Sequence, residues 1–306
     1  MSQLISLRKK IRSIQTTKKI THAVRLTSMA QYNKIEKMNA PWAMYARYIK
    51  EMFTQLLTGT QSQINQEKFP FLSSGKPDVR PLYIIIATSR GLCGGLNTQL
   101  FSFFNEYFPS REKRDQGYFI AIGQRAITFL KRHEVSNVVH SYAQLNATDA
   151  FPLAEELLSK IMDEASAYTS VTIFASEAKS FFIQKPRLIS IMPLNLDATS
   201  SLKKEVEQSV ETAFVEQTFG SNSEFLWEQN KDEVLFHLGC QYLKNSVVSI
   251  LLQAMRAEHA ARFLAMENST NNAEKILERM TLQFNRQRQA LITKEVSELS
   301  AGLLKH

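Results

Sequence analysis

The feature that most constrains this chain is its last stretch, residues 231–301, which contains no proline and a single glycine, Gly239. Apolar residues recur through it at steps of three and four, which is helical spacing rather than strand spacing. They include Leu235, Leu238, Tyr242, Leu252, Met255, Phe263, Met266, Ile276, Met280 and Phe284. One unbroken helix here would extend on the order of 100 Å, several times the usual length. Such a helix cannot bury its apolar stripe inside one compact domain, so it needs a second long helix or a surrounding sleeve.

A second long helix is predicted at the other end of the chain. Residues 1–40 contain neither glycine nor proline, and Pro41 interrupts a helical pattern that resumes up to Leu57. Its apolar positions lie near one face, at Leu4, Leu7, Ile11, Ile14, Val24 and Met38. We therefore expect an antiparallel coiled coil of the N- and C-terminal helices, irregular because the heptads are imperfect in both.

Between the two helices the pattern changes to alternating strands and helices. A continuous apolar run, Pro81–Ala87, predicts a strand that is buried on both faces. Further strands are predicted at Tyr118–Ile122, Val135–His140, Val171–Ala175 and Leu188–Met192, the last at an edge because prolines bracket it. Helices are predicted at Leu96–Tyr107, Gln124–Arg132 and Pro152–Ala167. This alternation predicts a mostly parallel sheet in a Rossmann-like α/β side domain.

These patterns divide the chain into four parts. Residues 1–58 form the first helix of the coiled coil and residues 77–193 the α/β domain. Residues 194–230 are a polar connection with a helical stretch at Leu202–Glu216, and residues 231–306 form the second helix of the coil.

Composition limits the class of protein. The chain has 306 residues, of which 44% are hydrophobic and 22% charged, as in globular proteins. Its longest apolar runs are far shorter than a membrane span, and basic residues from Arg8 onward exclude a secretory signal core. With two cysteines, Cys93 and Cys240, neither a disulfide framework nor a cysteine metal site is expected. A reducing, cytoplasmic compartment fits these features.

The net charge of +8 is concentrated in the first helix. Residues 1–40 carry nine basic residues against Glu36 alone, which accounts for the whole excess: Arg8, Lys9, Lys10, Arg12, Lys18, Lys19, Arg25, Lys34 and Lys37. The imbalance predicts an acidic partner. Protein is favoured over nucleic acid because no aromatic residues are interleaved with the basic ones. A coiled-coil adaptor that binds nucleic acid or an anionic membrane through this helix remains the alternative.

The middle domain contains no recognisable catalytic set. The Gly91-Leu-Cys-Gly-Gly95 turn follows a strand, but it matches neither phosphate-binding glycine motif and no lysine follows it. A tight structural turn, with Cys93 as a packed thiol, is therefore favoured over a nucleotide site. The six histidines show no metal-ligand spacing. We therefore expect no catalytic residue, no metal and no cofactor. The rival interpretation is an α/β enzyme with helical arms that binds a small molecule at this turn.

Three blocks of sequence carry a resemblance to a known family. They are Ile11-Arg-Ser-Ile-Gln-Thr-Thr-Lys-Lys-Ile-Thr-His-Ala23, Arg90-Gly-Leu-Cys-Gly-Gly-Leu-Asn97, and Glu258–Ala273 followed by Asn285-Arg-Gln-Arg-Gln-Ala-Leu-Ile-Thr293. In this order, and along nearly its whole length, the chain resembles the gamma subunit of bacterial F-type ATP synthases. It departs from the family at Ser89, where Asp is usual, and at Val24, Arg25 and Ala257.

The resemblance implies a rotor shaft without catalysis of its own in a proton-translocating ATP synthase. The coiled coil would penetrate a ring of three alpha and three beta subunits, which hold the ATP sites. The globular end would sit with the epsilon subunit on the membrane ring of c subunits. The chain would then lie at the cytoplasmic face of the bacterial inner membrane, held there peripherally through the complex.

The same resemblance implies roles for individual residues. Arg288 and Gln289 would contact a loop of a catalytic subunit in the alpha/beta ring. The apolar end of the shaft, with Leu299, Leu303 and Leu304, would run in a collar of that ring. Gly91, Gly94 and Gly95 would form the structural turn.

Overall fold

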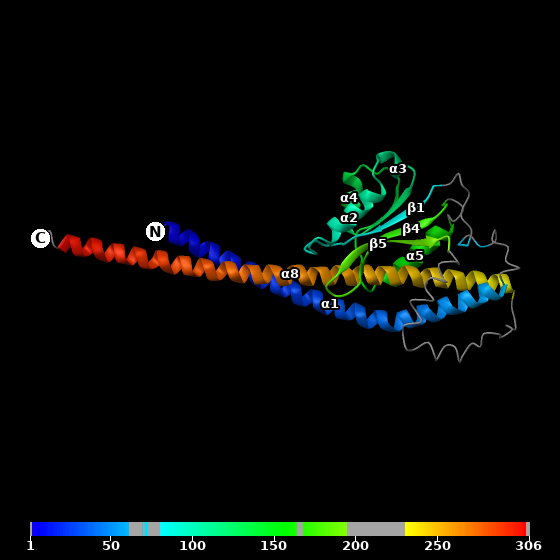
Figure 1. The fold of residues 1–306 in the computed structure, drawn as a ribbon, viewed down its shortest axis with the longest axis horizontal. Helices are drawn as coiled ribbons and strands as arrows, with labels where there is room; N and C mark the ends of the chain where they lie inside the picture. The colour runs from blue at the N-terminus through cyan, green and yellow to red at the C-terminus, as the bar shows by residue number, and fades with distance from the viewer. Residues whose placement is uncertain are drawn as a thin grey trace. The chain divides into compact units, whose positions relative to one another are not determined.

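The computed structural model describes residues 2–60, 69, 71–72, 80–163, 168–194 and 230–303. Two very long helices occupy the ends of the chain, α1 (Ser2–Thr60) and α8 (Lys231–Leu303), and α1 continues through Pro41. A sheet with flanking helices lies between them in the sequence (Figure 1). The prediction of long terminal helices around an α/β domain is confirmed. The predicted helical stretch at Leu202–Glu216 lies outside the described residues.

The chain divides into two compact units, and both long helices contribute to each of them. Unit 1 comprises residues 1–32, 92–94 and 259–306, and unit 2 comprises residues 33–91 and 95–258. The division into residues 1–58, 77–193, 194–230 and 231–306 therefore stays a prediction about domains, because the long helices are shared between the units.

Unit 2 is built on a five-stranded sheet with the order β3-β2-β1-β4-β5. The strands are β1 (Leu82–Ile86), β2 (Tyr118–Ile122), β3 (Val138–Tyr142), β4 (Val171–Ala178) and β5 (Gln184–Met192). The first four are parallel, whereas β5 pairs antiparallel with β4 and lies at the edge, as the flanking prolines predict. The mostly parallel, Rossmann-like arrangement is thus confirmed.

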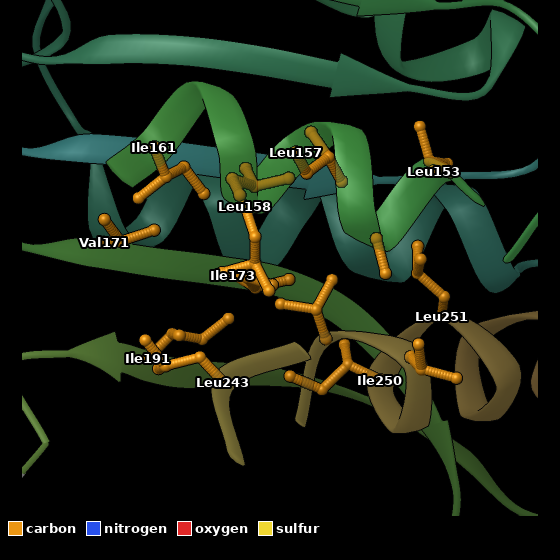
Figure 2. Close-up of a cluster of buried hydrophobic side chains, with 14 of the residues drawn as sticks. Leu153, Leu157, Leu158, Ile161, Val171, Ile173, Ile191, Leu243, Ile250 and Leu251 are labelled. Carbon is orange, nitrogen blue, oxygen red and sulfur yellow. The ribbon is translucent and has the colours of Figure 1, made fainter. Parts of the chain in front are cut away.

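Helices cover both faces of this sheet. On one face, α2 (Leu96–Tyr107) and α4 (Gln124–Arg132) pack on alternate residues of the strands, around Ile85, Phe119 and Phe174. The short α3 (Arg111–Asp115) leads into β2. On the other face lie α5 (Ala150–Asp163) and the unit 2 parts of α1 and α8, in a larger apolar cluster. Figure 2 shows Leu158 and Ile161 of α5 beside Ile173 and Val171 of β4, with Leu243 and Leu251 of α8 in the same cluster.

The starts of two strands differ from the sequence prediction by three or four residues, for identifiable reasons. The strand predicted at Val135–His140 begins at Val138, because residues 133–135 instead close the end of α4: the Val135 amide donates to the Leu130 carbonyl at 3.1 Å and Glu134 has φ 52°. The strand predicted at Leu188–Met192 begins at Gln184, because pairing with β4 extends the hairpin past Pro186. Proline is tolerated there because β5 is an edge strand.

Candidate functional site

The helix pair of unit 1 is held by polar contacts that define its direction. Lys18 Nζ lies 2.7 Å from Glu274 Oε1, and Arg25 forms an ion pair with Glu267. Between these pairs, the hydroxyls of Thr21 and Thr270 are 2.9 Å apart. As the residue numbers on α1 rise from 18 to 25, those of the partners on α8 fall from 274 to 267. The two helices are therefore antiparallel, as predicted.

Small side chains fill the contact between these helices. The buried residues of unit 1 here are Ser28, Ala260, Ala261, Arg262, Met266, Thr270 and Ala273. Since the distance between packed helix axes depends on the side chains at the contact, such residues let the helices approach closely. Only Arg262 and Met266 among them are large, which explains why the heptads looked imperfect in the sequence.

Beyond Glu274, only one stripe of α8 is shielded from solvent. Its half-buried residues recur at steps of three and four, at Leu277, Met280, Phe284, Gln287 and Leu291. On α1 the matching positions are the buried Leu7 and the half-buried Leu4, Ile11 and Ile14. The remaining faces of both helices are exposed along this part of the pair.

Arg288 and Gln289 lie on the exposed part of α8, directly beside this stripe. Within the described part of the chain, neither side chain has a hydrogen-bond or ion-pair partner. Leu299 and Leu303 belong to the last turns of α8, but their side chains, and Leu304 as a whole, lie outside the described residues.

The exposed faces of unit 1 are apolar and cationic at the same time. Apolar side chains stand in solvent on α1 at Ile5, Ile20 and Leu26, and on α8 at Ile276, Leu282, Ile292 and Val296. Among the exposed basic residues in the unit 1 part of α1, five lack an acidic partner within the described part of the chain: Arg8, Lys9, Lys10, Arg12 and Lys19. A single chain gains nothing from this combination, which is typical of a surface that another protein covers.

The glycine turn after β1 is filled by the chain's own side chains. A Cβ on Gly91 would lie 2.8 Å from Arg125 Nη2, so the missing side chain makes room for that guanidinium. Asn97 binds the start of the turn, because its Nδ2 donates to Thr88 Oγ1 at 2.7 Å and its Oδ1 accepts the Thr88 amide at 3.2 Å. These contacts in unit 2 support the structural interpretation of the turn.

Residues 92–94 of the glycine turn belong to unit 1. Cys93 is buried, as expected of a packed thiol. Gly94 has φ +59°, a left-handed conformation that glycine adopts without strain, and its Cβ position would lie 3.6 Å from Ala265 Cβ of α8. Gly95 precedes α2, and its carbonyl accepts the Gln99 amide at 2.9 Å.

Comparison with known proteins assigns the chain to a family. The sequence profile of the family described as ATP synthase matches residues 3–304. The ATP synthase gamma chain of Xylella fastidiosa strain 9a5c is 30% identical over 303 residues, which cover 97% of this chain and 96% of the relative. That of Pelotomaculum thermopropionicum is 28% identical over 304 residues, covering 99% and 98%.

The chain belongs to the ATP synthase gamma-chain family.

Solved structures agree with this assignment at the level of the fold. The gamma-chain fold described above is similar to a chain of the Euglena gracilis mitochondrial ATP synthase rotor, with a TM-score of 0.59 and 15% identity over 95% of this chain and 99% of that one. A chain of the Tetrahymena thermophila mitochondrial central stalk and c-ring gives a TM-score of 0.58 at 16% identity, covering 81% and 98%. In the described part of this gamma chain, no helix is long and apolar enough to cross a membrane.

Sequence reasoning missed the carboxylates that pair with the basic helix of this gamma chain. Lys18 and Arg25 are seven residues apart, and so are their partners Glu267 and Glu274. Seven residues is two helical turns in a coiled coil, so the matched spacing could have predicted both ion pairs and the antiparallel register of unit 1.

Proposed function

We propose that this chain is the rotor shaft of an F-type ATP synthase and transmits rotation to the catalytic subunits through the exposed faces of unit 1. The observation that carries the proposal is the stripe at Leu277–Leu291: α1 covers one line of α8 and leaves apolar and cationic side chains around the rest of the pair. A helix pair with this surface is suited to run inside a ring of other subunits. Membership of the gamma-chain family supports the same conclusion.

The mechanism follows from differential affinity. A rod that lies off-centre in a ring of three catalytic subunits presents a different face to each of them. Each face stabilises the open and closed forms of a subunit to a different extent, and only such a difference can shift a conformational equilibrium. Turning the rod then moves each site through its states, and because coupling free energies are reciprocal, ATP hydrolysis can drive the rod in the opposite direction.

We assign the polar contacts of the shaft to Arg288 and Gln289. Their guanidinium and amide groups offer several donors to carboxylates of a catalytic subunit. The end of α8, with Leu299, Leu303 and Leu304, is proposed to supply the apolar surface that turns in the collar of the alpha/beta ring.

The other proposed partners are the epsilon subunit and the membrane ring of c subunits, so that the chain is peripheral to the cytoplasmic face of the bacterial inner membrane. The role that we propose for this chain is not catalytic.

Arg125 and Asn97 occupy the surroundings of the glycine turn, where a nucleotide phosphate would otherwise approach. We expect calorimetry of the isolated chain to show no stoichiometric ATP binding, and stoichiometric binding would favour the α/β enzyme instead.

The experiment that tests the proposed shaft is a double substitution, Arg288→Ala with Gln289→Ala. Losing hydrogen bonds to charged groups costs roughly 1.5–3 kcal/mol, so ATP turnover or assembly of the complex should fall. The shaft itself should keep its helicity, because both positions are exposed and alanine favours helix. A matched control is Arg132→Ala with Gln124→Ala, the same residue types at exposed positions of α4 in unit 2.

Two results would contradict this assignment. Unchanged turnover and assembly in the double variant would mean that Arg288 and Gln289 are only a solvated face. If the chain instead fails to co-purify with alpha and beta subunits and binds DNA or anionic vesicles with strong salt dependence, the basic adaptor becomes the better interpretation.

A further inference from the structure

The hairpin that joins β4 to β5 ends in a turn with an unusual surface. The strands pair as far as Ala178 and Gln184, which leaves Lys179–Ile183 as the turn. Its sequence is Lys-Ser-Phe-Phe-Ile, and of the residues that dominate turns, which are glycine, proline, asparagine, aspartate and serine, it contains only Ser180. Phe182 is 73% exposed and Ile183 51% exposed, and Phe182 is the most exposed large hydrophobic residue in the described part of the chain.

This turn is held in one conformation by its own hydrogen bonds. The amides of Ser180 and Ile183 each donate to the other residue's carbonyl at 3.3 Å, and the Ile183 amide also lies 3.2 Å from Ser180 Oγ. Gln184 Nε2 donates to the Phe181 carbonyl at 2.7 Å, and the rings of Phe181 and Phe182 pack edge to face at 5.4 Å. Phe182 is therefore displayed by an ordered turn, not carried on a loose loop.

The base of the hairpin is joined to both long helices within unit 2. Arg256 of α8 donates through Nη2 to the Ala178 carbonyl at 3.3 Å, and its Nη1 lies 3.1 Å from Glu36 Oε2 of α1. One guanidinium thus connects β4, α1 and α8. A force that acts on the hairpin would be transmitted to the helix pair through this joint.

Basic residues flank the exposed aromatic ring in the sequence. Lys179 and Lys185 are exposed and lack an acidic partner within the described ranges, while Arg187 is paired with Glu177 at 3.0 Å. A run of exposed apolar residues is a fault in a solvated turn unless it has a function. Together the apolar residues and the lysines fit an apolar pocket that is bordered by carboxylates.

We propose that the turn Lys179–Ile183 docks on another protein subunit of the ATP synthase, with Phe182 in an apolar pocket and Lys179 and Lys185 against carboxylates at its border. This inference rests on the proposed function for the existence of the complex. A rigid aromatic side chain in a closed pocket is typical of the residues that dominate binding energy. A membrane surface fits less well, because two lysines and one inserted aromatic ring give only weak attachment to anionic lipids, and such attachment requires no ordered turn.

The test places the photoreactive amino acid p-benzoylphenylalanine at position 182 of the chain in the purified complex. Illumination followed by mass spectrometry identifies what lies against the ring. We expect one cross-linked peptide from another subunit, with Asp or Glu residues beside the linked position. Changing Lys179 and Lys185 to glutamine in the same chain should lower the cross-link yield severalfold, and so should raised salt.

A second photoreactive site, at the exposed Lys113 of α3, is the control for non-specific labelling. Identical products at both positions, products with lipid or with a second copy of this chain, or no product at position 182 would each overturn the proposal. Failure of the shaft function is recognised separately, because the complex then does not assemble around the chain at all. An assembled, active complex without a cross-link at position 182 contradicts this inference alone.

Discussion

At the scale of single residues, Gly239 shows how one missing side chain positions a core. It lies within α8, and a Cβ at this position would be 2.3 Å from Cζ of Phe71, a ring that is fully buried. Phe71 also packs against Phe53, Phe69 and Phe236, so it cannot move away freely. The glycine that interrupts the helical sequence pattern is thus explained by close packing.

Gly239→Ala should therefore destabilise unit 2. The alanine gains about 1 kcal/mol in helix propensity, but overpacking a core costs typically about 1–3 kcal/mol. Amide exchange of peptides around position 239 should become faster than in the wild type. Asn271→Ala, at an exposed position of the same helix, should leave exchange unchanged or slower. Slower exchange in Gly239→Ala would show that Phe71 does not fill the space.

His259 gives unit 1 a pH dependence. Burial, and then the charge of Arg262, lower the pKa of His259 from 6.5 to about 4. The unfolded chain therefore binds a proton between pH 6.5 and 4 that the folded chain does not, so this residue makes stability fall as the pH drops through that window. The loss amounts to about 1.4 kcal/mol for each pKa unit.

His259→Gln should flatten this part of the stability profile, measured as the midpoint of denaturant unfolding between pH 7 and 4. Asn271, which is exposed on the same helix and does not titrate, offers the control substitution Asn271→Gln, which should leave the slope unchanged. An equal slope in the wild type and His259→Gln would contradict the buried, neutral histidine.

At the scale of elements, Asn245 is an unsatisfied polar residue in the apolar face of α8. The residue is 1% exposed, and within the described part of the chain neither Oδ1 nor Nδ2 has a hydrogen-bond partner. A buried amide without a partner costs roughly 1–3 kcal/mol. Its neighbours Leu243, Val247 and Val248 belong to the apolar cluster between the helices and the sheet.

Asn245→Leu should consequently stabilise the packing of α8 in unit 2 by about 1–2 kcal/mol. The measurement is the denaturant midpoint of the full chain, with Ser249→Leu, a half-buried position one turn further on, as the control for added apolar volume. A lower midpoint in Asn245→Leu than in the wild type would mean that the amide is satisfied by a group such as an ordered water.

The elements also show what a single sequence can and cannot predict. Leu96–Tyr107, Gln124–Arg132 and Tyr118–Ile122 were predicted with the bounds observed, because periodicity and turn residues act locally. The late start of β3 depends on how the end of α4 is closed, and the early start of β5 depends on its pairing with β4. Those interactions join residues whose contact no short pattern encodes.

At the scale of the whole molecule, the candidate site could be predicted only in part. The sequence located the polar stretch with Arg288 and Gln289 and the basic helix α1. Which faces stay uncovered depends on the register of α1 against α8, set by pairs such as Arg25 with Glu267, and this became visible only in the structure. The hairpin with Phe182 was missed because its sequence was assigned partly to a strand and partly to no element.

The central claim is that this chain turns within its complex, and the most direct measurement is single-molecule rotation. The alpha/beta ring is fixed to a surface, and a fluorescent or bead probe is attached to an exposed residue of unit 2, such as Lys113. When ATP is added, the account predicts stepwise rotation of the probe in one direction, with stepping that slows as the ATP concentration is lowered. ATP hydrolysis by the same complexes without rotation of the probe would contradict the shaft.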